Sequence, residues 1–142
     1  VGDPQSLPGT FVYDTEPACR ALVVARELDQ AKVWPFVRAV QQAFYIDVED
    51  VTHAAVLVAL AESVGFPPAE FGELFDQQKT REMTLADVAW VADLGMAGLP
   101  ILLAEREGQL ALLANGCQPV DQVLGLLTRW VEAGQKAGVV TA

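Results

Sequence analysis

The sequence has few of the residues that build common catalytic centres. Its 142 residues include one histidine, His53, and two cysteines, Cys19 and Cys117. These are too few for an ordinary zinc site, and a Ser-His-Asp triad would have to include His53. We therefore predict no metal site, no cofactor and no catalytic residue within this chain.

Positive charge and long apolar runs are also scarce. Nine Lys and Arg face nineteen Asp and Glu, which gives a formal net charge of -10. Such a surface repels phosphate, so nucleic acid and anionic lipid are excluded as expected partners. The apolar runs are all much shorter than the roughly 18 residues that a membrane-spanning helix requires. We predict no nucleic-acid partner and no membrane span.

The cysteine count bears on the compartment. Cys19 and Cys117 lie 98 positions apart, without the dense framework typical of secreted disulfide proteins. The first nine residues lack the basic head and apolar middle of a secretory signal. We therefore expect a cytoplasmic protein. A length of 142 residues, 52% of them hydrophobic, suits one domain.

Caps, breakers and apolar spacing predict five helices between residues 14 and 94. The first follows Asp14 or Thr15 and ends near Leu28, and the second runs from Asp29 to Asp47. The apolar stripe of the second helix consists of Val33, Phe36, Val37, Val40 and Phe44. The third follows Thr52 and ends at Gly65, the fourth opens at Pro67 and Pro68, and the fifth begins at Thr84 and ends at Leu94. Thr84 and Asp87 have a spacing similar to that of a capping box, which favours a start there.

The pattern changes after Pro100. Residues 101–104 and 110–114 are short apolar runs joined by the four residues 105–108, which predicts a β-hairpin. A last helix follows Pro119, with an inner face formed by Val120, Val123, Leu124, Leu127 and Val131. The continuous apolar strands predict helices on both faces of the sheet. Two strands are marginal alone, so the sheet is expected to be incomplete, with residues 10–13 as a weak further strand.

Three segments carry a resemblance to a known family. These are residues 13–21 (YDTEPACRA), residues 39–45 (AVQQAFY) and residues 95–100 (GMAGLP). The chain resembles the DsbA-like thioredoxin-fold family, in particular its cytoplasmic dithiol-disulfide isomerases and the related 2-hydroxychromene-2-carboxylate isomerases. The resemblance covers roughly residues 10 to 132. It matches only the latter part of the family pattern, because these 142 residues contain no Cys-x-x-Cys.

The resemblance implies an α/β, thioredoxin-like fold with a large helical insertion. Residues 1–13 are an extended lead-in, residues 14–94 the helical insertion, and residues 95–142 the proline loop, β-hairpin and closing helix of a single domain. The family's proline before the hairpin is typically cis, and the backbone preceding it pairs with a bound peptide or thiol. By this resemblance, Leu99 and Pro100 are the expected substrate-binding residues.

The other chemically active residues have ordinary structural interpretations. Cys19 shares a helix face with Leu22 and Val23, which favours a small buried side chain over a reactive thiolate at a helix start. Cys117 has no expected redox role. We expect His53 to be an exposed residue in the first turn of a helix, and we expect Trp34, Trp90 and Trp130 to lie in the core. We expect a solvated loop at Asp47, Glu49 and Asp50. At the surface, we expect Arg20 and Arg26 to pair with Glu27 or Asp29.

Three functional hypotheses remain open. The first is a DsbA-type thiol-disulfide oxidoreductase family protein that is redox-inert in these 142 residues, because its redox segment is not among them. The second is a non-catalytic binding or assembly module that forms a homodimer in which an edge strand or the lead-in segment is shared between chains. The third is a relative of the glutathione-dependent isomerases, with glutathione or another thiol or peptide as ligand.

Overall fold

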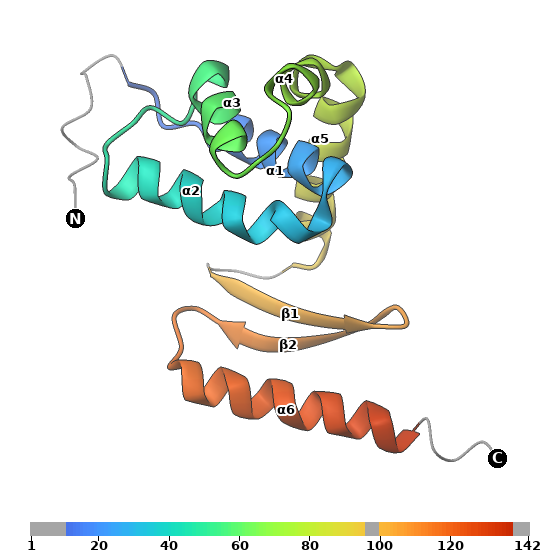
Figure 1. The fold of residues 1–142 in the computed structure, drawn as a ribbon. Coiled ribbons are helices and arrows are strands. Elements are labelled where there is room, and N and C mark those ends of the chain that lie inside the picture. The colour runs from blue at the N-terminus through green and yellow to red at the C-terminus, as the bar shows by residue number, and fades with distance from the viewer. Residues whose placement is uncertain (1–10, 96–99, 138–142) are drawn as a thin grey trace. The chain divides into compact units, whose positions relative to one another are not determined.

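Helices precede the sheet along the chain, as the sequence predicts (Figure 1). The computed structural model describes residues 11–95 and 100–137, with side chains as far as residue 134. The chain divides into residues 1–94, here called the helical unit, and residues 95–142, here called the hairpin unit.

The helical unit contains five α-helices and one short 3₁₀ helix among its described residues. They are α1 (Glu16–Leu28), η2 (Gln30–Lys32), α2 (Val33–Tyr45), α3 (Ala54–Ser63), α4 (Pro68–Asp76) and α5 (Gln78–Asp93). Pro17 and Pro68 each lie in the first turn of a helix, where their missing N–H groups have no helical partner to lose. Gly65, at φ +90°, follows the end of α3 in a left-handed conformation that suits glycine.

The predicted start of α5 is wrong by six residues. The helix begins at Gln78, and Thr84 lies inside it with its side chain buried. The Thr84 hydroxyl donates to the Thr80 backbone oxygen at 2.8 Å, while the Thr80 hydroxyl donates to the Leu74 backbone oxygen at 2.6 Å. Each threonine therefore bonds backward to a carbonyl, so neither acts as an N-cap.

The core of the helical unit is built mainly from aromatic side chains. Phe36, Phe66 and Phe71 form three edge-on or tilted ring pairs with centroid distances of 5.5 to 6.1 Å. Leu57 and Phe75 are also buried in this cluster. Fully burying side chains of this size contributes about 1.5–3 kcal/mol each, which makes this cluster the main source of stability in the unit.

The hairpin unit consists of β1 (Ile101–Arg106), β2 (Gln109–Asn115) and α6 (Val120–Ala137). The strands are antiparallel, and Glu107 and Gly108 join them with φ values of +53° and +77°. Two consecutive positive φ values are typical of the tight two-residue turn of a hairpin. The predicted four-residue connection is therefore wrong, because Glu105 and Arg106 continue β1.

A β-bulge distinguishes the two strands. The register shifts between Leu102 and Leu103 of β1, and Leu113 is the extra residue of β2 at that point. Leu113 is buried, and α6 packs along β2 (Figure 1). The predicted inner face of α6 is partly wrong, because Val120, Leu124 and Val131 are exposed, which leaves Val123 and Leu127 half-buried.

Arg106 connects the end of β1 to α6. Its guanidinium lies over the Trp130 ring at 4.1 Å from the centroid. Nη1 and Nη2 donate to the backbone oxygens of Trp130 and Val131 at 3.3 and 3.5 Å. The guanidinium also occupies the space that a side chain at Gly134 would take. The absence of a Cβ at Gly134 therefore lets Arg106 lie flat on the helix.

The sheet contains only β1 and β2 within the described residues, which agrees with the expected incomplete sheet. Residues 11–13 of the proposed third strand have no strand structure, and residue 10 lies outside the described residues. The register places Leu110 and Leu112 on the sheet face opposite to Arg106, and they are 43% and 53% exposed. Within the hairpin unit, α6 is the one described helix, so the prediction of helices on both faces stays a prediction for the whole chain.

Candidate functional site

The proline loop ends at the start of the hairpin. Pro100 is exposed, and its backbone oxygen accepts a hydrogen bond from the Gly116 N–H at 2.8 Å. This bond extends the ladder of β1 and β2 by one pair and fixes the backbone at Pro100. Leu99 lies outside the described residues, and with it the peptide bond before Pro100. The expected cis form and the ligand contact of these two residues therefore stay predictions.

Cys19 lies on α1 and is exposed, so its predicted burial is wrong. The helical face that contacts the core carries Arg20, Val23 and Val24 instead. The pKa of the Cys19 thiol is raised, first by desolvation and then by the negative charges of Glu16, Asp14 and Asp87. A raised pKa lowers the thiolate fraction at neutral pH, which is the opposite of what a redox-active thiol needs.

Cys117 is the second free thiol. It is exposed and follows Gly116, whose φ of +80° turns the chain after β2. Cys19 and Cys117 belong to different units and form no disulfide. Neither cysteine has another cysteine three positions away, as the family's Cys-x-x-Cys redox motif requires. The two thiols therefore do not form a dithiol site of that kind.

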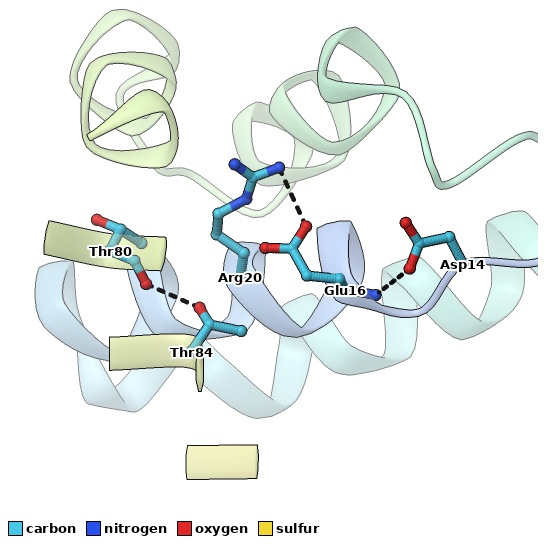
Figure 2. Close-up of polar contacts among 5 residues, drawn as sticks. All are labelled: Asp14, Glu16, Arg20, Thr80 and Thr84. Atoms are coloured by element: carbon cyan, nitrogen blue, oxygen red, sulfur yellow. Dashed lines mark hydrogen bonds and ion pairs between the residues drawn. The ribbon is translucent and has the colours of Figure 1, made fainter. Parts of the chain in front are cut away.

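Arg20 is buried, and it pairs with Glu16 instead of the expected Glu27 or Asp29 (Figure 2). Its Nη2 lies 3.3 Å from the Glu16 carboxylate, and its guanidinium lies 4.1 Å from the centroid of the Phe75 ring. The Nε and Nη1 atoms have no hydrogen-bond partner among the described residues. Arg26 also pairs differently than expected, with Asp87 of α5 at 3.0 Å. Arg20 thus joins α1 to α4, and Arg26 joins α1 to α5.

Asp50 organises the loop before α3. Its Oδ1 accepts hydrogen bonds from the Thr52 N–H at 2.9 Å and the Thr52 hydroxyl at 2.5 Å, and its Oδ2 lies 2.9 Å from His53 Nδ1. Partial desolvation opposes ionisation, but the bonds from Thr52 and the attraction to His53 lower the pKa of Asp50 overall. His53 is exposed, as expected, and it is the N-cap residue of α3.

No metal centre forms among the described side chains. No three of their His, Cys, Asp and Glu residues lie close enough together to hold an ion. Asp47 and Glu49 are exposed, which fits the expected solvated loop. Nor does any helix of the described chain have the length and apolar character needed to span a bilayer.

The tryptophans do not form a common core. Trp34 of α2 and Trp90 of α5 are 71% and 51% exposed, so their predicted burial is wrong. Trp130 is half-buried and stacks under Arg106. The aromatic spacing indicated helix positions correctly, but an exposed ring and a buried ring occur with the same spacing.

An aromatic group that the sequence pattern did not predict lies beside the start of α1. Phe11 and Tyr13 pack against Phe44 of α2 with ring centroids 6.2 and 5.8 Å from that of Phe44, and Tyr45 lies 4.9 Å from the same ring. Electrostatic interaction with Tyr45, together with desolvation and a hydrogen bond to it, raises the pKa of Tyr13. The adjacent aromatic residues at 44 and 45 were the available signal.

Comparison with known proteins identifies the family. The family model of the DSBA-like thioredoxin domain matches residues 2–128. A putative protein disulfide isomerase from Nitrosomonas europaea is 36% identical over 93% of this chain, with a TM-score of 0.87. The cytosolic disulfide reductase DsbM from Pseudomonas aeruginosa is 27% identical over 87% of the chain, with a TM-score of 0.71, and its structure with GSH is 26% identical over the same share, with a TM-score of 0.69.

These similarities concern part of each relative. The chain spans 65% of the Nitrosomonas europaea protein and 62% of the Pseudomonas aeruginosa protein in either structure. A search of the curated proteins found no match. The family match nevertheless covers most of these residues, and the helical segment, hairpin and closing helix occur in the order that the resemblance implied. The chain therefore belongs to the DsbA-like thioredoxin domain family.

Proposed function

We propose that the chain supplies the helical and proline-loop portion of a thiol-disulfide oxidoreductase, and that residues 1–142 are redox-inert by themselves. The family match over residues 2–128 carries the first part of the proposal. The sequence's lack of Cys-x-x-Cys supports the second part. The exposed Cys19, whose pKa is raised, adds to that support. The dithiol would come from outside these residues. A cytoplasmic location belongs to the same proposal, supported by the cytosolic relative from Pseudomonas aeruginosa.

An insulin-reduction assay tests the redox-inert state. With dithiothreitol or glutathione as reductant, the chain is expected to add nothing to the background rate, and so are Cys19→Ser and Cys117→Ser. The Pseudomonas aeruginosa DsbM protein serves as positive control. Turnover by the unaltered chain that disappears in either serine variant would locate a reactive thiol here and contradict the proposal.

We also propose that Leu99 and Pro100 contact a thiol or peptide ligand. Pro100 is exposed, and its carbonyl is held in the ladder by Gly116, so the backbone before it has a fixed end. A relative's structure with GSH makes glutathione the first ligand to test. Amide NMR shifts are expected around Pro100 on addition of glutathione, and they should weaken in Pro100→Ala. A titration in which no amide signal of the residues near Pro100 shifts would remove this part of the proposal.

Homodimer formation is a second candidate function. A two-stranded sheet is marginal in water, and an exposed apolar strand edge favours pairing with another strand. The bulge at Leu113 interrupts β2, so the regular strand β1 presents the better edge. Leu110 and Leu112 of β2 give the hairpin an exposed apolar face beside this edge. In this arrangement, two copies would pair their hairpins.

Light scattering distinguishes the dimer from a monomer. The unaltered chain is expected to be dimeric at high concentration, and Leu112→Lys to be monomeric because a charge enters the shared face. Leu124→Lys of α6 is the matched control, since Leu124 is 52% exposed against 53% for Leu112. A monomer of the unaltered chain, or equal effects of the two lysines, would count against pairing through the hairpin.

A further inference from the structure

Two adjoining hollows lie at one end of the helical unit. The smaller, about 140 Å³, lies between residues 11–15 and α2. The larger, about 400 Å³, lies between the same segment and the loop before α3. Phe11, Asp14 and Thr52 line both, so the two hollows adjoin, and together they are called the groove here. This volume is enough for a small ligand with an apolar part and a polar part.

The smaller hollow has a mainly apolar and aromatic wall. Phe11, Tyr13, Phe44 and Tyr45 all line it, together with Val40 and Val51. Phe44 is buried, but Tyr13 and Tyr45 are 66% and 50% exposed. An aromatic ring has an electron-rich face and an electron-poor edge, so a cation is attracted to an exposed ring face. Such walls favour aliphatic chains, and they favour cations over anions.

The charged groups along the groove are mainly carboxylates. Asp14 and Asp50 line it, together with His53, and no Lys or Arg side chain is among the described residues that line it. Asp50 is already engaged by Thr52 and His53. Asp14 uses Oδ1 to accept the Glu16 N–H at 2.9 Å, while its other oxygen points away from that amide (Figure 2). Asp14 forms no ion pair within the described part of the chain.

We propose that this groove binds an ammonium group carried on a short aliphatic chain. The chain would lie against the rings of Phe11, Tyr13 and Tyr45, which line the smaller hollow, and the ammonium group would bind the outward oxygen of Asp14. A carboxylate beside an aromatic wall satisfies both ends of such a ligand, because the charge gains an acceptor and the chain leaves water. Such binding would be independent of the thiol chemistry proposed above.

Three probes of equal length test the charge requirement. Amide NMR titrations of the full chain with n-butylammonium, n-butanol and butyrate are expected to shift residues near 11–15 and 45 with n-butylammonium only or most strongly. Nα-acetyl-lysine methylamide distinguishes the two sources of this chemistry: tighter binding than n-butylammonium indicates a peptide lysine, and weaker binding indicates a free amine. Equal binding of the alcohol and the ammonium would overturn the proposal.

Two conservative variants test the named contacts. Asp14→Asn keeps an acceptor for the Glu16 N–H but removes the charge, and it is expected to weaken n-butylammonium binding by about two- to five-fold. Tyr45→Leu keeps an apolar wall and is expected to weaken it by about two- to five-fold through loss of the cation–π contact. Asp76→Asn, at an exposed carboxylate that lines neither hollow, controls for net charge. Equal affinities of Asp14→Asn and Asp76→Asn would overturn the assignment of Asp14, and circular dichroism would establish that each variant is folded.

Discussion

Replacing Gly134 with alanine tests how Arg106 is held on α6. The new methyl group would occupy the position of the guanidinium that stacks on Trp130. Alanine is favoured over glycine inside a helix by about 1 kcal/mol. Displacing Arg106 removes a cation–π contact worth about 0.5–1 kcal/mol and two long hydrogen bonds that contribute little. The two effects nearly cancel, so Gly134→Ala is expected to leave the free energy of unfolding almost unchanged.

Gly125 of the same helix provides the matched control. A side chain there would meet nothing within 4 Å. Gly125→Ala is therefore expected to stabilise the hairpin unit by about 1 kcal/mol, through helix propensity alone. The contrast between the two alanines reports the space that Arg106 occupies.

Urea unfolding followed by Trp130 fluorescence measures both effects. Trp34→Phe and Trp90→Phe make Trp130 the only tryptophan, and both replaced rings are exposed. Arg106→Gln removes the colliding atoms, so Gly134→Ala should then stabilise by about 1 kcal/mol. If Gly134→Ala stabilises equally with and without Arg106, the guanidinium is not where the structure has it, and the reasoning is refuted.

Three further predictions concern the helical unit. In a Cys117→Ser background, Cys19 is expected to react with iodoacetamide at pH 7 more slowly than a cysteine in an unstructured peptide, because its raised pKa lowers the thiolate fraction. Asp87→Asn removes one of the charges that raise this pKa and should speed the reaction. A reaction of Cys19 faster than that of the peptide would contradict this prediction. Asp50 has a lowered pKa, so its contribution to stability is present above the model-peptide value of 3.8 and is lost as the pH falls through the lower folded value. Thr52→Val should raise the Asp50 pKa in an NMR titration, and an unchanged pKa would mean that the Thr52 hydroxyl does not hold the carboxylate. Arg20→Met keeps an unbranched side chain but removes two unpaired donors. We expect it to lower the free energy of unfolding by at most about 1 kcal/mol, or to raise it. A loss of about 3 kcal/mol or more, measured by thermal unfolding, would show that the buried charge has better partners than the structure indicates.

Helix boundaries were predictable where local chemistry alone determines them. Pro68 opens α4 and Gly65 follows α3, because a missing N–H and a positive φ are needed at those points whatever the surroundings. Thr84 resembled a cap in sequence but is a buried residue that bonds to Thr80. A threonine hydroxyl serves either role, and the choice depends on neighbouring helices that a local pattern does not contain.

The candidate site was less predictable than the fold. Cys19 has apolar neighbours at helical spacing, yet the core contacts the adjacent face of α1, so the thiol is exposed. A hydrophobic stripe defines which residues share a face, but small differences in helix rotation decide which of them is covered. The groove beside Asp14 depends on residues from 11 to 53, and only the folded chain brings them together.

The distribution of buried apolar side chains has a consequence for synthesis. All of the core's phenylalanines precede residue 76, whereas Leu113 is the one buried apolar residue described after it. A ribosome delivers the phenylalanines first, and their contacts join helices that are near neighbours in the chain, which favours rapid early assembly. The helices of the helical unit would thus fold before the strands leave the ribosome. The hairpin, which has one described buried apolar residue, would fold last.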